Sequence, residues 1–513
     1  MKKAYGILAL AALLCGAFVL PGGALATEYR EEMNIAITAN PPSLEPHSVN
    51  SNIVGAIGSH IYEPLFAMNA RHEPTAVLAE SYGVSADGKV YTIKLRRGVK
   101  FHNGQEMKAE DVAASMTHWL GASGKAKALL GGTVFAADGD YTVTMTMPEA
   151  YGDALSVLAA PVQFAAVYPR ALAEEAAAGK GLSTCVGTGP YRLKEWKQDQ
   201  YVLLERYDSY RQPAGEPSGF AGRKGALTER LCFRVVVDPA TRVAGLQTGQ
   251  FDVVEDFPAD RYAEVAGDKS MVLRAKTSGT LNMFLNTTKG IMANRKMRQA
   301  ILAAMNCSDV MLASYGEPDL YILDPGWCNP DDALWGSDAG REYYNQNNPE
   351  KAKKLLAEAG YENEKIVLVT TADYAEMYNA TLAAHDQLRK VGINAEVQSY
   401  DFATFMERRS DPDKFSLFIT SNGYNMTPVQ LAVLMKNWAG LDVPEIPEGI
   451  AAIRRAASPE EASKAWAELQ RFLYEYGAAI VFGHYSDVFG ESARTEGVDL
   501  QRFALYWNAR VAK

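Results

Sequence analysis

The stretch Tyr91-Thr92-Ile93-Lys94-Leu95-Arg96-Arg97-Gly98-Val99-Lys100-Phe101-His102-Asn103-Gly104 is the most informative segment of this 513-residue chain. Polar and apolar residues alternate over 90–95, directly after Asp87-Gly88, and this pattern predicts a hairpin strand. Apolar residues at helical spacing follow over 108–120, and a second alternating run covers 141–147. We therefore expect the region to about residue 184 to mix helices and strands.

Further along the chain, strands and helices alternate more regularly. Asn348-Pro349 begins a predicted helix that Gly360 ends. Predicted strands at 366–370, 394–399 and 415–420 alternate with helices at 374–391 and 402–409, which favours a mainly parallel sheet. Ligands bind beyond the carboxyl ends of such strands. The segment Ser421-Asn422-Gly423-Tyr424-Asn425 is thus a predicted binding loop.

The N-terminus predicts export. Lys2 and Lys3 precede an apolar run over 7–20, and Ala24-Leu25-Ala26 has the small-x-small pattern of a signal-peptide cleavage site. The run is shorter than the roughly 20 residues that span a bilayer. We expect cleavage after Ala26. Because Leu14 before Cys15 disfavours a lipid anchor, we also expect a periplasmic location.

Composition excludes several classes of protein. A hydrophobic fraction of 48% and a charged fraction of 22% are those of a globular chain, not a disordered one. A net charge of −10 argues against nucleic acid as a partner, because phosphates would repel such a surface. The length suggests about three domains or lobes, and we expect a monomer.

Four cysteines remain after export, in an oxidising compartment: Cys185, Cys232, Cys307 and Cys328. They allow three pairings. Cys307–Cys328 closes the shortest loop and Cys185–Cys232 is a second candidate, while four buried thiols are the alternative. No Cys-x-x-Cys motif occurs, so neither a redox motif nor a zinc ribbon is indicated.

Catalytic motifs find little support. The sequence has neither His-Glu-x-x-His nor Gly-x-Ser-x-Gly, and in the P-loop-like spacing at Gly83–Lys89 Val90 replaces the magnesium-binding hydroxyl. His102 and His118 are predicted on different elements, so no metal ligand is expected. We expect no enzyme, no catalytic residue and no cofactor; an exported hydrolase is the alternative from another class.

The opening stretch also belongs to a set of motifs that resembles the bacterial extracellular solute-binding proteins of family 5, the dipeptide- and oligopeptide-binding components of ABC importers. The resemblance covers nearly the whole mature chain. The other matching segments are Tyr62-Glu63-Pro64-Leu65, Leu78-Ala79-Glu80-Ser81-Tyr82, Lys108-Ala109-Glu110-Asp111-Val112, Val186-Gly187-Thr188-Gly189-Pro190-Tyr191, the run from Arg242 to Val254, Phe284-Leu285-Asn286-Thr287 and the helix over 349–360.

The resemblance implies an α/β, two-lobed periplasmic binding protein (type II, cluster C-like) with a hinge. The first lobe would comprise 27–60, 185–282 and 485–513, with a subdomain inserted at 61–184, and the second lobe 283–484. The chain crossings near 280–285 and 483–487 would be the hinges. The closed form would deliver its solute to a membrane permease and ATPase.

The resemblance also implies where a solute would bind. The predicted cleft residues are Asn40, Asn286, Phe402, Phe405, Arg408, Asn422, Tyr424, Asn425 and Trp438. Several of these residues have a purely structural role as the alternative: Asn40 as a turn former, Phe405 as a core residue, and Arg408, with Arg409, as a solvated helix end. Tyr424 is the strongest candidate, because a large ring in a Gly- and Asn-rich loop needs something to contact.

One departure from the family bears on the cargo. Peptide-binding relatives place an aspartate in this loop to pair with the α-amine, whereas residues 421–428 contain no acid. A buried ammonium without a counter-charge is costly. The sequence therefore predicts capture of peptides or a peptide-like solute in the cleft, with oligosaccharides, opines and nickel chelates as alternative cargo.

Overall fold

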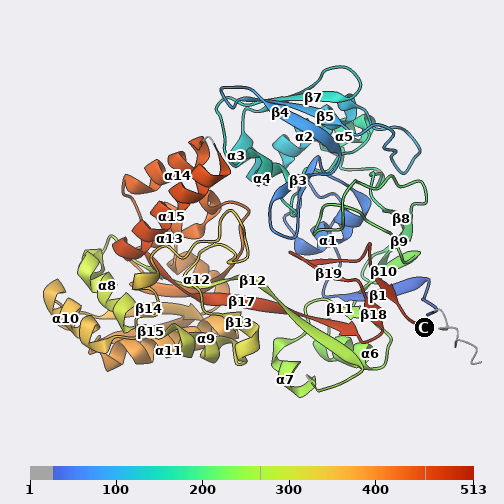
Figure 1. Cartoon of the computed structure of the whole chain (residues 1–513). Helices are drawn as coiled ribbons and strands as arrows, with labels where there is room; N and C mark the ends of the chain where they lie inside the picture. Colours follow the sequence, from blue (N-terminus) through green and yellow to red (C-terminus); the bar gives the residue numbers. More distant parts are fainter. Residues whose placement is uncertain (1–26, 266, 457) are drawn as a thin grey trace, which may run out of the picture.

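The computed structural model describes residues 27–513 except 266 and 457 (Figure 1). The predicted signal peptide, residues 1–26, lies outside the described residues. No helix within them combines the length and apolar character needed to cross a bilayer.

Two long strands, β12 (Met271–Leu285) and β17 (Ala479–Ser492), connect the two halves of the molecule. They pair antiparallel, with register shifts at Thr277/Gly279 and Leu281/Asn282. Both belong to a continuous mixed sheet of order β15-β14-β16-β12-β17-β11-β1-β10-β9-β8. Figure 1 shows them running from the helix-rich part at the left to β11 and α6 at the right.

The part of the chain between β12 and β17 forms one α/β unit. Its sheet edge is parallel, β14 pairing with both β15 and β16. Asn348 and Gly360 bound α10 as predicted, because the Asn348 side chain accepts from Lys351 N and Gly360 has a φ of 71°. The elements are α8 Arg295–Ala304, α9 Cys307–Tyr315, β13 Tyr321–Ile322, α10 Pro349–Ala359, β14 Ile366–Thr371, α11 Ala375–Lys390, β15 Ala395–Tyr400, α12 Phe402–Arg408, β16 Leu417–Gly423, α13 Lys436–Ala439, α14 Glu445–Arg455 and α15 Pro459–Tyr476.

The other half of the large sheet gathers N-terminal, central and C-terminal segments. β1 pairs in parallel with β10 and β11, so distant parts of the chain lie side by side. The elements are β1 Glu32–Ile37, α1 Asn52–Ile61, β8 Tyr191–Lys197, β9 Tyr201–Arg206, β10 Arg230–Val235, α6 Pro239–Gln247, β11 Val253–Val254, α7 Tyr262–Val265, β18 Thr495–Glu496, β19 Asp499–Leu500, β20 Ala504–Leu505 and β21 Arg510–Val511.

Residues between α1 and β8 form a separate layer around a four-stranded sheet of order β4-β5-β7-β6, at the top of Figure 1. The segments quoted first belong here. His102 accepts from Gly187 N at 3.3 Å and donates to Gly189 O at 3.0 Å, so two of the quoted motifs contact each other. The elements are β2 Phe66–Met68, β3 Pro74–Ala76, β4 Ala79–Val84, β5 Val90–Leu95, α2 Ala109–Ala122, α3 Gly124–Leu130, β6 Val134–Ala137, β7 Thr142–Thr146, α4 Ala154–Leu158 and α5 Arg170–Glu175.

Two large apolar cores match this division. One contains Trp119, Tyr168 and Trp507 and joins the inserted layer to the N- and C-terminal segments. The second lies between β12 and β17 in sequence and contains Phe418 and Trp466. Each half therefore buries its own apolar residues, and the crossing strands join them.

Two expectations need correction. The sheet is parallel only locally, because β12 pairs antiparallel with both β16 and β17 as the chain leaves and re-enters the second half. The four cysteines are free thiols. Cys307 begins α9 with its sulfur near Val481 O, Cys232 is buried in β10, and Cys185 is only half-buried, so neither proposed disulfide is formed.

Candidate functional site

A cavity of about 790 Å³, including its opening to solvent, lies where the two halves meet. β12 contributes Lys276 to its lining, and β17 contributes Tyr485 and Asp487. The remaining walls come from both halves. The lining residues are Asn52, Met68, Asn69, His72, Pro161, Phe220, Lys276, Thr277, Ser278, Asn329, Asp332, Gly423, Tyr424, Asn425, Met426, Tyr485, Asp487, Gln501 and Arg502.

Charged side chains of both signs face this cavity without ion-pair partners. Among the described residues, no ion pair within 4.0 Å involves Lys276, Arg502, Asp332 or Asp487, although an electrostatic attraction links Arg502 and Asp487. Desolvation raises the pKa of Asp487, and it also raises the pKa of Asp332. The cavity thus holds two carboxyl groups and two cations that a zwitterionic solute would complement.

Arg502 is held by neutral groups of both halves. Its Nε donates to Asn52 Oδ1 at 3.2 Å, and its Nη1 donates to Tyr424 O at 2.8 Å. Burial lowers its pKa from the usual value. Because no carboxylate lies within ion-pair distance of it, the guanidinium keeps capacity for an anionic group of a ligand.

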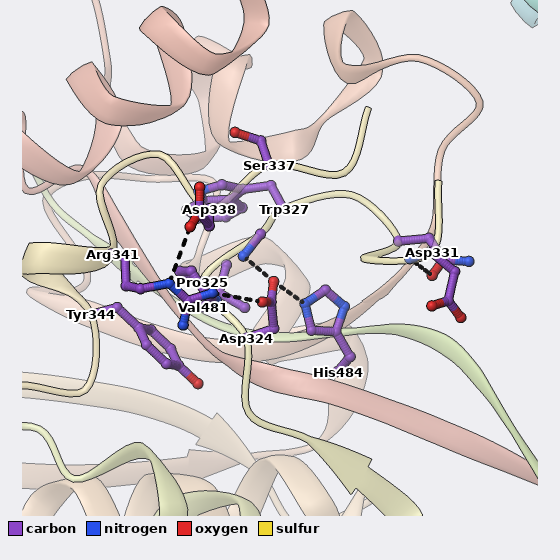
Figure 2. Close-up of polar contacts among 12 residues, drawn as sticks. Asp324, Pro325, Trp327, Asp331, Ser337, Asp338, Arg341, Tyr344, Val481 and His484 are labelled. Carbon is purple, nitrogen blue, oxygen red and sulfur yellow. Dashed lines mark hydrogen bonds and ion pairs between the residues drawn. The ribbon is translucent and has the colours of Figure 1, made fainter. Parts of the chain in front are cut away.

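A polar network behind the cavity fixes Tyr424. A hydrogen bond of 2.6 Å joins its hydroxyl to His484 Nδ1, and His484 Nε2 lies 3.6 Å from Asp324 Oδ1. Figure 2 shows His484 and Asp324 pointing toward one another, with Arg341 between Asp324 and Asp338. Burial opposes ionisation of Asp324, but contacts with His484 and the backbone outweigh it and lower the pKa.

The predicted binding loop reaches the cavity. Tyr424 and Asn425 line it, and Asn422 lies next to them with its side-chain oxygen accepting from Asn282 Nδ2 at 3.0 Å. The strand runs further than predicted, because β16 ends at Gly423 and so includes the first three residues of the predicted loop. Tyr424 and Asn425 do follow the carboxyl end of this strand.

The other predicted residues lie elsewhere. Phe405 is fully buried, Phe402 packs on Tyr374, and Trp438 packs between Phe284 and Arg409. Asn286 and Arg408 line a separate open depression beside Lys414. Asn40 contacts the turn between β8 and β9, because its Nδ2 donates to Gln198 Oε1 at 2.5 Å. The structure does not bring these six residues to the interlobe cavity.

Several cavity residues were not predicted. They are Asp332, Asp487, His72 and Arg502, which come from segments other than that of Tyr424. Asp487 lies in the predicted hinge crossing at 483–487, and Asp332 belongs to the adjacent pair Asp331-Asp332, whose sequence pattern favours a solvated loop. Two carboxyl groups, those of Asp332 and Asp487, therefore line the cavity although residues 421–428 contain no acid.

Three comparisons identify relatives. A model of the bacterial extracellular solute-binding proteins, family 5 (middle part), matches residues 73–437. The chain is 28% identical over 495 residues, 91% of each chain, to the "Probable peptide ABC transporter periplasmic-binding protein y4tO" of Sinorhizobium fredii. It is 30% identical over 385 residues to the glutathione-binding protein GsiB of Escherichia coli O1:K1, covering 72% of this chain and 70% of that protein.

A solved structure, NikA from Brucella suis in complex with Fe(III)-EDTA, has the same fold. Its TM-score is 0.77 at 21% identity, covering 94% of this chain and all of NikA. The expected two-lobed α/β fold is thereby confirmed. The family match covers most of the chain, so the protein belongs to the bacterial extracellular solute-binding proteins of family 5.

Proposed function

We propose that this protein is the periplasmic binding component of an ABC importer and that its cargo is a small zwitterionic peptide. The two relatives named for a peptide and for glutathione support this class of cargo. After cleavage behind Ala26, the monomer would capture the peptide between its lobes and deliver it to a permease and ATPase.

The unpaired charges of the cavity carry the proposal. Asp487 accepts the α-amine and replaces the aspartate that residues 421–428 lack, while Arg502 and Lys276 meet the ligand carboxylate. Each ionic contact would give an ion-pair partner to a charged group that has none within 4.0 Å among the described residues.

The lobe boundaries form part of the same proposal: 27–60, 185–282 and 485–513 for the first lobe, 61–184 for the inserted subdomain and 283–484 for the second. Hinges at 280–285 and 483–487 lie in the crossing strands β12 and β17. Rotation about them would open the cavity to solvent.

A non-peptide anion is the second candidate cargo, because Lys276 and Arg502 also suit an opine or a metal chelate with several carboxylates. The exported-hydrolase alternative gains less support. Tyr424, His484 and Asp324 form a chain of contacts, but burial raises the pKa of the Tyr424 hydroxyl well above its usual value, which makes it a poor nucleophile.

The test is calorimetric titration of protein that has been unfolded and refolded to remove cargo. The panel comprises glutathione, di- to tetrapeptides, their N-acetylated and C-amidated forms, oligosaccharides, an opine and nickel- or iron-EDTA. We expect binding of free peptides and at least tenfold weaker binding of both blocked forms. Equal affinity for N-acetylated peptides, or binding of non-peptides alone, would overturn the proposal.

A further inference from the structure

A cluster of three buried side chains lies away from the cavity. Its members, each of which offers an atom that could bind a metal ion, are Glu45, His47 and His118. These atoms all lie within 4.8 Å of each other. Glu45 and His47 lie in the segment after β1, whereas His118 lies on α2 of the inserted layer. None of the three lines the interlobe cavity.

Two of the ring nitrogens in this cluster lack hydrogen-bond partners. His47 Nδ1 lies 3.7 Å from Glu45 Oε1, and His118 Nε2 lies 3.6 Å from the same oxygen. Both distances exceed a normal hydrogen bond, and both nitrogens are buried and unsatisfied. An unpaired buried polar atom destabilises the folded state, so this arrangement calls for a further occupant.

The tautomer of His47 can be assigned from its other nitrogen. Nε2 lies 2.9 Å from Ala166 O, and a carbonyl oxygen only accepts, so Nε2 carries the proton. In the neutral ring, Nδ1 then presents a lone pair toward a carboxylate oxygen. Two lone pairs facing each other repel unless a cation lies between them.

We propose that Glu45, His47 and His118 bind a divalent transition-metal ion of the zinc class. Two imidazoles and one carboxylate form a common zinc ligand set. Ligands at about 2.0–2.2 Å from a tetrahedral ion lie roughly 3.3 Å apart. The two histidine-to-carboxylate separations, 3.6 and 3.7 Å, are close to this value, and all three ligand atoms lie within 4.8 Å of one another, so the two histidine rings would move closer together around the ion.

The surroundings are those of a supported metal site. The Ala166 carbonyl orients His47 as outer-shell acceptors do for metal-bound histidines. Tyr168 Oη donates to Glu45 Oε1 at 2.9 Å, and Ser48 N donates to Oε2 at 3.0 Å, which fixes the carboxylate. The ion would join the N-terminal segment to the inserted layer and stabilise their junction.

The test uses purified protein stripped with a chelator and titrated with Zn²⁺ alone, followed by calorimetry, metal analysis and thermal unfolding. We expect one zinc per chain and a Tm several degrees higher with zinc. His47→Gln and His118→Gln should each lose this uptake and shift. His385→Gln is the matched control, because His385 is half-buried in the other half and bonds Ala395 O.

Substitution by Co²⁺ keeps the proposal testable if a variant does not fold. In the wild-type protein, intense visible bands of a low-coordinate Co²⁺ centre with nitrogen and oxygen ligands would support the site. Absence of stoichiometric uptake by the stripped wild-type protein would overturn it, as would zinc binding that persists in both folded site variants. In that case a proton between His118 and Glu45 satisfies the cluster.

Discussion

Asp487 provides the sharpest test at the scale of single residues. Asp487→Asn keeps the shape of the side chain but removes the charge that we assign to the ligand's α-amine. Hydrogen bonds to charged groups contribute about 1.5–3 kcal/mol, so we expect free-amine peptides to bind about 10- to 100-fold more weakly. N-acetylated peptides should be unaffected. Calorimetric titration measures both affinities.

Asp331→Asn is the control for this change, because Asp331 is a nearby exposed acid that does not line the cavity. It should leave both affinities as they are. Unchanged binding of free-amine peptides by Asp487→Asn would mean that the amine is held elsewhere, with Asp332 the next residue to replace.

Glu255 makes stability depend on pH. Burial raises its pKa from 4.5 to about 7, opposed by a hydrogen bond from Tyr506 Oη of 2.7 Å. The folded state therefore holds the proton more tightly than the unfolded state. This contribution is complete below about pH 4.5 and is lost as the pH rises through 7. The loss amounts to about 3 kcal/mol.

Glu255→Gln removes this titration. We expect its free energy of unfolding, relative to that of the wild-type protein, to rise between pH 4.5 and 7 and then level off. Urea unfolding at several pH values measures the difference. The exposed Glu80→Gln serves as control and should give a flat difference; a flat difference for Glu255→Gln as well would show that Glu255 titrates normally in the folded protein.

At the scale of elements, local signals predicted well where they act within one turn or one strand. Asn348-Pro349 and Gly360 set the ends of α10, and the alternation over 90–95 coincides with β5. β12 was not predicted, because its first half is largely half-buried and its second half is buried on both faces. A strand with two environments has no single period to detect.

The motif around Gly187 supports a prediction about how two elements meet. A Cβ at Gly187 would lie 2.1 Å from Ile61 O at the end of α1, and this oxygen is a backbone atom that no side-chain rotation can move away. Gly187→Ala must therefore push α1 away from the motif, and we expect a loss of about 3 kcal/mol. Thermal and urea unfolding measure it.

Gly104→Ala is the matched control within the family motifs. Gly104 has a φ of 86° but no atom within 4 Å of the position of a Cβ. It should lose only about 1 kcal/mol, from backbone strain. Equal losses for the two variants would show that the approach of Gly187 to α1 relaxes at little cost.

At the scale of the whole molecule, the site was predictable only in part. Tyr424 and Asn425 follow a strand, so their position at the sheet edge could be inferred from sequence. His72, Asp332 and Arg502 reach the same cavity from three other segments, and no local pattern marks their meeting. The charge balance of the cavity, which decides the cargo, emerges only when the two halves come together.

Contacts between the two halves that lie outside the cavity should also change the affinity for the ligand. Arg454 on α14 donates to Leu129 O, and its guanidinium lies 4.1 Å from the ring centre of Tyr151, both in the inserted layer. It does not line the cavity. These contacts form only when the halves are together, so they favour the closed state. One hydrogen bond and one cation–π contact contribute about 1–2 kcal/mol.

Arg454→Ala should therefore weaken binding of the tightest panel peptide by up to about 5- to 30-fold without changing the ranking of ligands. Small-angle scattering of the same variant should show a larger radius of gyration than the wild-type protein at subsaturating peptide. Arg455→Ala, at an exposed neighbouring position, is the control. Because the cavity residues are untouched, a change in ligand ranking would mean that Arg454 shapes the cavity, and unchanged affinity would mean that the halves close without it.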